Sequence, residues 1–403
     1  MDGPINKIVI VGAGQAGATV AFGLRRAGFD GEIAVIGEET HLPYERPQLS
    51  KEMLQPRQNR GHRSIMTQRD YEEQRIRLEL GRKVVRADAD RSRVVLDDGS
   101  EIEYDKLVIA TGVKPRKLPA LPNDAERVHY LRTVEDAGNL RAALEAAKPV
   151  AIIGGGVIGL EVAVAARALG CDVTLIETAD RLMARSVDEI VSHYLDRVHR
   201  SNGVDIRYGA HATELRGDGT LKLSDGSTVP ACTVLVGIGV TPNVAGFEHL
   251  GITDSAGVKV DAHGQSSVEG VFATGDVASQ PNGGGFRRIE TWANAQDHAL
   301  NIVRNLLGDL SPYLSPTWFW SDQGSTNLQV VGDATQGKRA LRGNEHGDAF
   351  SVFWLNEDDR VTGCSSVNSP KDMAVARRWV KQASRVDPRR LADSSVKLRD
   401  CAV

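Results

Sequence analysis

Residues 7–24 read KIVIVGAGQAGATVAFGL, an apolar β-branched run that passes through a glycine-rich turn into a helical pattern. Such a run is typical of a buried parallel strand. The turn GAGQAG, residues 12–17, has glycine where a dinucleotide loop needs it: in the tight turn, at the pyrophosphate, and where helix packs on strand. A second strand, EIAVIG, is predicted at 32–37 and is followed by Glu38. Ordinary turns also contain such glycines, but the strands on both sides favour a first dinucleotide unit.

The same pattern recurs between residues 149 and 177. PVAIIGGG (149–156) predicts a strand that enters GGGVIG (154–159), the helical run LEVAVAARALG comes next, and the strand DVTLIE ends at Glu177. A carboxylate at this strand end can accept hydrogen bonds from both hydroxyls of an adenine ribose, and it repels a 2′-phosphate. We therefore predict that this unit binds NAD rather than NADP. The alternative is a solvated acid at a strand end.

Length and composition exclude several classes of protein. A chain of 403 residues predicts two or three domains. The net charge of −4, without a dense Lys/Arg block, argues against nucleic acid as a main partner. No apolar run approaches the roughly 18 residues of a membrane helix, and the glycine-rich start lacks signal-peptide features, so we expect a cytoplasmic protein without membrane contact. The 4 cysteines, scattered and without a C-x-x-C pair, indicate neither a disulfide framework nor a metal site.

Two further strand ends point to flavin in the first unit. DKLVIATG (105–112) ends in Thr111-Gly112, where the chain could cross between domains, and GVFATGDVA (270–278) contains Asp276 after a predicted strand. A carboxylate opposite the first helix could hold polyol hydroxyls such as those of the FAD ribityl chain. Each strand end is a weak signal by itself, but their order around two glycine loops is specific.

The order GAGQAG, ATG, GGGVIGLE and ATGD resembles that of the two-dinucleotide-binding flavoproteins, the glutathione-reductase-like superfamily. Within it, RPQLSK, YLRTVEDA, RIETWANAQ and WFWSDQG resemble the NADH:ferredoxin reductases of bacterial oxygenase systems, the class of putidaredoxin reductase and biphenyl dioxygenase reductases. The resemblance covers essentially the whole chain. It implies an α/β fold with two Rossmann-like dinucleotide-binding domains, for FAD and for NAD, plus a C-terminal α+β domain.

The resemblance also implies domain boundaries. The FAD domain is expected to be discontinuous, at 1–113 and 243–316, with the NAD domain inserted at 114–242 and the C-terminal domain at 317–403. These boundaries agree with the glycine and proline residues at both joins, which interrupt regular structure: Gly112 with Pro115, and GIGVTPN at 237–243. VVLDDGSEI and LKLSDGSTV predict one small hairpin in each nucleotide domain.

The segment YERPQLSK (44–51) is expected by resemblance to run beside the flavin ring. Lys51 matches the family lysine near flavin N5, with Arg46 and Pro47 as the preceding pair and Glu161 as the partner acid of the lysine. Flavin reduction leaves negative charge, which a fixed ammonium stabilises with little reorganisation. Gln48 stands where a second proline is common in the family, so the segment lacks one of the usual constraints on its backbone. The alternative for Lys51 is a solvated surface lysine.

Motifs and resemblance together give a set of expected site residues. Lys51 and Glu161 are the expected catalytic residues. The expected FAD-binding residues are Gly12, Gly14, Ala16, Gly17, Glu38, Arg46, Pro47, Lys51, Val84, Thr111, Gly112, Arg132, Asp276, Trp292 and Trp320. The expected NAD-binding residues are Gly154, Gly156, Ile158, Gly159, Glu161, Glu177, Gly239 and Glu290. For Trp320, a role in electron exit and simple packing both stay open.

The stretch before Cys171 contains no cysteine, which excludes the disulfide reductases and thiol-dependent NADH oxidases of the superfamily. The expected function is FAD-dependent NADH:ferredoxin oxidoreductase. A hydride passes from NADH to non-covalent FAD, and single electrons pass to a 2Fe–2S ferredoxin, plant-type or Rieske-type, that feeds an aromatic-ring dioxygenase or similar oxygenase.

Two alternatives remain. One is reduction of rubredoxin or of a P450-linked ferredoxin, which the residues do not separate from the first function. The other is a non-catalytic protein like apoptosis-inducing factor, whose basic surface and targeting peptide are missing here. Arg287, Arg288, Arg377 and Arg378 are candidates for a basic rim that steers an acidic ferredoxin, although most charged faces merely face water.

Overall fold

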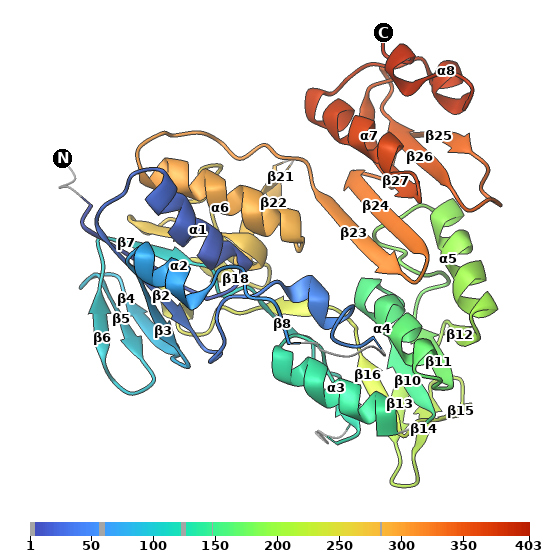
Figure 1. The fold of residues 1–403 in the computed structure, drawn as a ribbon, viewed down its shortest axis with the longest axis horizontal. Coiled ribbons are helices and arrows are strands. Elements are labelled where there is room, and N and C mark those ends of the chain that lie inside the picture. Colours follow the sequence, from blue (N-terminus) through green and yellow to red (C-terminus); the bar gives the residue numbers. More distant parts are fainter. Residues whose placement is uncertain (1–4, 56–60, 122–125, 147, 283) are drawn as a thin grey trace. The chain divides into compact units, whose positions relative to one another are not determined.

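The computed structural model describes residues 5–55, 61–121, 126–146, 148–282 and 284–403. It divides into two compact units, whose elements are labelled in Figure 1. The first unit comprises residues 1–46, 62–114 and 240–315, and the second comprises residues 47–61, 115–239 and 316–403. Among the described residues, no helix is both long enough and apolar enough to cross a membrane.

The first unit is built on a parallel five-stranded sheet. Its strands lie in the order β20 (Val271–Ala273), β7 (Lys106–Ile109), β1 (Lys7–Val11), β2 (Glu32–Gly37) and β3 (Ile76–Leu80). Alternate residues of β1 point to opposite faces, so Ile8 and Ile10 enter one core and Val9 and Val11 enter another. The first core is formed with α1 (Gln15–Arg26) and α6 (Trp292–Leu306), which pack on each other.

Smaller antiparallel sheets supply the second core of this unit. One is formed by β4 (Val84–Asp88), β5 (Arg93–Leu96) and β6 (Glu101–Glu103). The other is formed by β18 (Thr253–Asp254), β19 (Gly257–Lys259), β21 (Ala278–Asn282) and β22 (Gly285–Arg288), in which β19 and β21 pair in parallel. The hairpin β5–β6 is the one predicted from VVLDDGSEI. The unit also contains the helix α2 (Gln68–Glu73) and the 3₁₀ turns η2 (Glu248–Leu250) and η3 (Gly275–Val277), while the turn η1 (Arg46–Leu49) begins at its boundary.

The second unit contains a similar parallel sheet. Its order is β12 (Val204–Tyr208), β11 (Val173–Glu177), β10 (Val150–Ile153), β16 (Thr233–Val236) and β9 (Val128–His129). The strand that enters the second glycine loop, β10, lies between β11 and β16, just as β1 lies between β2 and β7. The helices are α3 (Val134–Ala146), α4 (Val157–Ala168) and α5 (Glu189–Ser201), and β13 (Ala212–Leu215), β14 (Thr220–Leu223) and β15 (Thr228–Pro230) form the antiparallel addition.

An antiparallel five-stranded sheet completes the second unit. Its order is β23 (Trp318–Gln323), β24 (Thr326–Gly332), β27 (Val361–Val367), β26 (Phe350–Leu355) and β25 (Lys338–Gly343). One face packs on α7 (Pro370–Gln382), through residues such as Val331 and Trp379. From the other face, Val330 and Phe350 share a core with Leu160 of α4 and Tyr194 of α5. The two expected domains of this unit are therefore joined by a continuous hydrophobic core.

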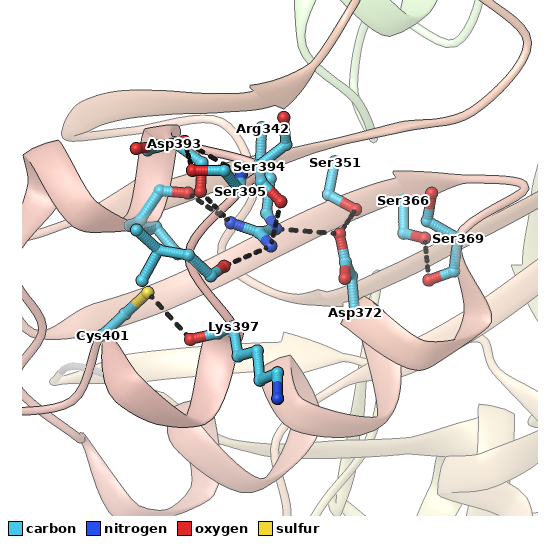
Figure 2. Close-up of polar contacts among 12 residues, drawn as sticks. Arg342, Ser351, Ser366, Ser369, Asp372, Asp393, Ser394, Ser395, Lys397 and Cys401 are labelled. Carbon is cyan, nitrogen blue, oxygen red and sulfur yellow. Dashed lines mark hydrogen bonds and ion pairs between the residues drawn. The ribbon is translucent and has the colours of Figure 1, made fainter.

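Arg342 of β25 fastens the last segment of the chain to this sheet (Figure 2). Its guanidinium donates to the backbone carbonyls of Asp393 at 2.8 Å and Val396 at 2.8 Å, and it lies 3.6 Å from the carboxylate of Asp372. The segment includes α8 (Pro388–Ala392) and η4 (Leu398–Asp400). Because this arginine is 9% exposed, its pairing with several carbonyls offsets the cost of burying its charge.

Where the chain passes between the units, β8 (Val113–Pro115) pairs with β17 (Val240–Pro242). These strands lie at the joins that Pro115 and GIGVTPN mark in the sequence. The predicted α/β class with two Rossmann-like halves and a C-terminal α+β part is confirmed. The two loop helices begin earlier than their apolar runs indicate, at Gln15 and Val157, because the last glycine of each loop already belongs to the first helical turn.

Candidate functional site

The first glycine loop is closed by backbone contacts that leave no room for side chains. Gly12 has φ of 120°, and a Cβ there would lie 2.2 Å from the carbonyl oxygen of Ala110. A Cβ on Gly17 would lie 1.9 Å from the carbonyl oxygen of Gly12. Gly14 differs, because a Cβ there would have no described atom within 4 Å. The middle glycine thus faces open space, as close approach of a pyrophosphate requires.

The second loop repeats this geometry. Gly154 has φ of 108°, and a Cβ there would lie 2.4 Å from the carbonyl oxygen of Gly237. A Cβ on Gly159 would lie 2.1 Å from the carbonyl oxygen of Gly154, whereas Gly156 again faces a space without described atoms within 4 Å. Neither Gly14 nor Gly156 supplies a side-chain cap, and the first turns of α1 and α4 contain no acid. The backbone amides in the first turns of α1 and α4 can therefore donate to an anion, so both loops fit a dinucleotide pyrophosphate.

The acids at the two strand ends are held differently. One carboxylate oxygen of Glu177 accepts from the backbone amide of Gly155 at 2.6 Å, and the other accepts from the amide of Ala179 at 2.8 Å. Glu38 is exposed and lies 3.7 Å from the ammonium of Lys83. The strand-end acid of the second unit is therefore part of its loop, whereas that of the first unit faces solvent.

Arg46 is held by two residues that sequence reasoning missed. Its guanidinium donates to the Glu39 carboxylate at 2.5 Å and also to the Tyr44 hydroxyl, and this hydroxyl donates to Glu39 at 2.5 Å. The position of Glu39, five residues before Tyr44 and seven before Arg46, could have indicated such an ion pair.

Lys51 and Glu161 are in direct contact within the second unit. The Lys51 ammonium lies 2.5 Å from the Glu161 carboxylate, and the Glu161 side chain is 2% exposed. The structure thus brings together the two residues expected to be catalytic, although they are 110 positions apart. Two serines that were not predicted complete the contacts: Ser50 donates to one carboxylate oxygen, and Ser321 of β23 donates to the other at 2.7 Å. Alternation along WFWSDQ, which places Ser321 on the inner face with Phe319, was the available signal.

Among the other expected FAD residues of the first unit, Thr111 and Gly112 follow the carboxyl end of β7, and Asp276 follows that of β20. Thr111 donates its hydroxyl to the carbonyl oxygen of Asn243 at 2.6 Å, and Gly112 has φ of 67°. Asp276 lies in η3, where a Cβ on the neighbouring Gly275 would come within 2.9 Å of Ala16. The turn that bears Asp276 therefore abuts the start of α1. Trp292 begins α6, and Val84 is buried at the start of β4.

Some residues expected to bind FAD lie in the second unit, and one residue expected to bind NAD lies in the first. Pro47, Lys51, Arg132 and Trp320, assigned to FAD, belong to the second unit, and Glu290, assigned to NAD, belongs to the first. Trp320 stacks on Trp318 with ring centroids 5.3 Å apart, and the backbone amide of Arg132 donates to Asp136 at 2.9 Å. Glu290 forms an ion pair with Arg288 at 2.7 Å.

The remaining expected NAD residues lie in the second unit. Ile158, in the first turn of α4, is 39% exposed. Gly239 has φ of 102°, and its carbonyl accepts from the amide of Arg116 at 2.9 Å. The left-handed backbone at Gly239 favours glycine there.

The cysteines form no pair that could relay electrons. Cys171, Cys364 and Cys401 are buried, which raises the pKa of each thiol, and Cys232 is exposed. Among the described residues, no group of three or more His, Cys, Asp or Glu side chains could hold a metal ion. Electrons delivered to this protein therefore have no route through an internal disulfide.

Comparison with known proteins gives matches over nearly the whole chain. Residues 6–299 match the family described as pyridine nucleotide-disulphide oxidoreductase, and residues 318–402 match the reductase C-terminal family. The chain is 71% identical over 403 residues, all of both proteins, to the ferredoxin–NAD(+) reductase component of the p-cumate 2,3-dioxygenase system of Pseudomonas putida. It is 40% identical, over 98% of each protein, to the corresponding component of the anthranilate 1,2-dioxygenase system of Burkholderia cepacia. A solved covalent putidaredoxin reductase–putidaredoxin complex contains a chain that matches with a TM-score of 0.93, 36% identity, and coverage of 98% and 97%.

Proposed function

Since the chain belongs to the pyridine nucleotide-disulphide oxidoreductase family and matches the reductase C-terminal family at 318–402, we propose that it is the NADH:ferredoxin reductase of an aromatic-ring dioxygenase system. The observation that carries this proposal is the 71% identity, over both full lengths, to the reductase component of a p-cumate dioxygenase system. The partner is a 2Fe–2S ferredoxin, and the terminal oxygenase receives electrons from that ferredoxin. We place the protein in the cytoplasm, where NADH is available.

The two glycine loops bind the two dinucleotides in this proposal. The amides at the start of α1 hold the FAD pyrophosphate, and Asp276, whose turn abuts α1, accepts from ribityl hydroxyls. The amides at the start of α4 hold the NAD pyrophosphate, and Glu177 binds the adenine ribose. We assign residues 1–113 and 243–316 to the FAD domain, 114–242 to the NAD domain and 317–403 to the C-terminal domain.

Bound FAD supplies the chemistry that a nicotinamide lacks, because it accepts two electrons together and releases them one at a time. Lys51 contributes a fixed positive charge that stabilises the negative charge of the reduced state. Glu161 holds the ammonium in place at 2.5 Å. Because the carboxylate is almost fully buried, it needs both the ammonium and the two serine hydroxyls to offset its desolvation.

Reduction of a P450-linked ferredoxin is the second candidate function. It is favoured by the fold shared with putidaredoxin reductase at 36% identity, but the identity to the dioxygenase component is about twice as high. Rubredoxin reduction remains an alternative acceptor specificity. A non-catalytic role like that of apoptosis-inducing factor is disfavoured by relatives that are named as ferredoxin reductases.

The test uses the purified protein loaded with FAD. Mixed anaerobically with NADH, it should bleach its flavin absorbance, whereas NADPH should act much more slowly. It should then reduce the ferredoxin of a p-cumate-type dioxygenase faster than a P450-linked ferredoxin or a rubredoxin in a panel of purified carriers. Failure of NADH to bleach the flavin would refute the enzymatic proposal, and a preference for another carrier would refute its assignment to a dioxygenase system.

A further inference from the structure

A buried row of polar side chains runs from the Lys51–Glu161 pair into the C-terminal sheet. Ser321 donates to Glu161 at 2.7 Å, the side-chain amide of Gln323 donates to the Ser321 hydroxyl at 3.1 Å, and the Gln323 carbonyl lies 2.8 Å from Nε2 of His199. Ser321 and His199 are 0% exposed, Gln323 is 1% exposed and Glu161 is 3% exposed. All these residues belong to the second unit, so the row lies within one compact part of the molecule.

The carboxylate determines the direction of every hydrogen bond in this row. An ionised Glu161 can only accept, so Ser321 must donate its single proton to it. The Ser321 oxygen then accepts from the amide nitrogen of Gln323, which turns the Gln323 carbonyl toward His199. That carbonyl needs a donor, so the Nε2 atom of His199 must carry the proton. The row thus links the Glu161 carboxylate, through hydrogen bonds, to the tautomer of a histidine on another helix.

The surroundings of His199 agree with this tautomer. Its Nδ1 atom is buried without a hydrogen-bond partner among the described residues. A bare lone pair there is tolerable, whereas a buried N–H without an acceptor is costly, so a doubly protonated ring is disfavoured. Burial lowers the pKa of His199, which also keeps the ring neutral.

We propose that Ser321 and Gln323 are positioning residues for hydride transfer: they hold the Glu161 carboxylate in the rotamer that reaches Lys51, and the Nε2–H tautomer of His199 fixes the Gln323 amide. This inference rests on the proposed function, because it gives Lys51 and Glu161 their roles in flavin reduction. The C-terminal sheet then completes the site that the NAD-binding helix α4 begins. The neighbouring Trp318 and Trp320 lie on the opposite face of β23 by strand alternation.

A packing role for the same residues makes a different prediction. If Ser321 merely filled space between β23 and α4, its replacement by alanine would alter stability but leave the rate of flavin reduction and the tautomer of His199 unchanged. Ser365 on β27 provides a matched control, since it is also a 0% exposed serine of the same sheet and its hydroxyl has no partner among the described residues.

The experiment compares the FAD-loaded wild type with Ser321→Ala, Ser321→Thr and Ser365→Ala. In anaerobic stopped flow across a range of NADH concentrations, Ser321→Ala should lower the limiting rate of flavin reduction about threefold to tenfold, the equivalent of one lost net hydrogen bond. The half-saturating NADH concentration should stay nearly constant, because the NAD loop is untouched. Ser321→Thr keeps the hydroxyl and should recover most of the rate, and Ser365→Ala should match the wild type.

A readout independent of activity comes from nitrogen-15 histidine NMR of the same FAD-loaded proteins, with the His199 signal assigned by a His199→Asn variant. Wild-type His199 should show the Nε2–H tautomer, and Ser321→Ala should disturb it while Ser365→Ala does not. An Nδ1–H tautomer or an imidazolium in the wild type overturns the inference, even if the alanine variant folds poorly. Equal rates in Ser321→Ala and Ser365→Ala overturn it as well. Absence of flavin reduction in the wild type would instead refute the proposed function.

Discussion

The two glycine loops of this protein share one backbone geometry but differ in the helical turn that comes after it. Gly12, Gly14 and Gly17 match Gly154, Gly156 and Gly159 in spacing, and each outer glycine of a loop excludes a Cβ by contact with a backbone carbonyl. Two positions after the last glycine, the first loop has Thr19, an uncharged residue whose hydroxyl accepts from Gln15 at 3.3 Å. The second loop has Glu161, paired with Lys51.

In the proposed function, this contrast distinguishes the glycine loop, which binds a dinucleotide, from the helical residue after it, which contributes to flavin reduction in the second unit. The loop itself is determined by the needs of a pyrophosphate, so it is nearly the same for both dinucleotides. The side chain at the start of the second helical turn is not needed for the loop and is free to carry charge. Only the second unit uses that freedom, and a buried ion pair results.

The largest effect is expected from substitutions that test whether the two loops have the same backbone conformation. Gly12→Ala and Gly154→Ala each place a Cβ within 2.4 Å of a carbonyl oxygen at positive φ. We expect each to lower the free energy of unfolding by about 3 kcal/mol or more, from steric overlap and backbone strain together. Urea denaturation of the purified variants measures this change.

Gly14→Ala is the control for that experiment, because its Cβ would meet no described atom within 4 Å. This variant should keep its stability without cofactor and lose affinity for FAD. Equal stability losses in Gly12→Ala and Gly14→Ala would contradict the steric account of the loop.

Removal of Lys51, the partner of the carboxylate that distinguishes the second loop, should have the next largest effect. Lys51→Met leaves the FAD loop intact but removes the ammonium next to Glu161. We expect the rate of NADH-driven flavin reduction to fall about 100-fold, as for loss of one preorganised electrostatic contact in an active site. Stopped-flow absorbance measures it, and FAD content per chain should stay at the wild-type value. A wild-type rate in this variant would contradict the catalytic assignment of Lys51.

A smaller effect is expected at the strand-end acids. Glu177→Arg removes an acceptor for the ribose hydroxyls and adds a partner for a 2′-phosphate, so the ratio of kcat/KM for NADH to that for NADPH should fall about tenfold or more. The matched change in the first unit, Glu38→Arg, should leave that ratio unaltered whatever it does to FAD. If both variants, or neither, change the ratio, the assignment of the second loop to NAD is wrong.

The smallest effect is expected in the salt dependence of ferredoxin reduction, which tests which unit carries the positive charges that attract ferredoxin. Arg377 and Arg378 are exposed on α7 of the second unit, and the Arg377 guanidinium lies 4.1 Å from the centre of the Trp318 ring. In the first unit Arg288 is already paired with Glu290. We expect the rate of ferredoxin reduction to fall about threefold between low and physiological salt because the steering field is screened.

Charge reversal separates the two candidate surfaces. Arg377→Glu with Arg378→Glu should flatten the salt dependence more than Arg287→Glu does. The pair Arg389→Glu with Arg390→Glu on α8 makes the same change in net charge at another helix and serves as the control. Salt-independent reduction by the wild type would count against a basic docking rim altogether.

Much of the architecture could be predicted because it depends on local patterns. Strands of β-branched residues that end in glycine, and a carboxylate at the end of the next strand, indicate a dinucleotide unit without any knowledge of long-range contacts. Glu39 with Tyr44, and Ser50 with Ser321, were missed because the hydrogen-bond partner of a site residue lies at no fixed sequence spacing from it. Ser321 could have been suspected only from the alternation along WFWSDQ, which places it on the inner face with Phe319.

Residue types at short spacing were enough to predict the two loops, the preference for NAD and the absence of a thiol relay. Long-range packing was needed to bring Lys51 to Glu161 across 110 positions and to carry the C-terminal sheet to the same carboxylate through Ser321. The physical reason is that the partners of a buried charge are determined by tertiary packing and not by sequence spacing. Packing of one sheet on two helices is a property of the whole unit.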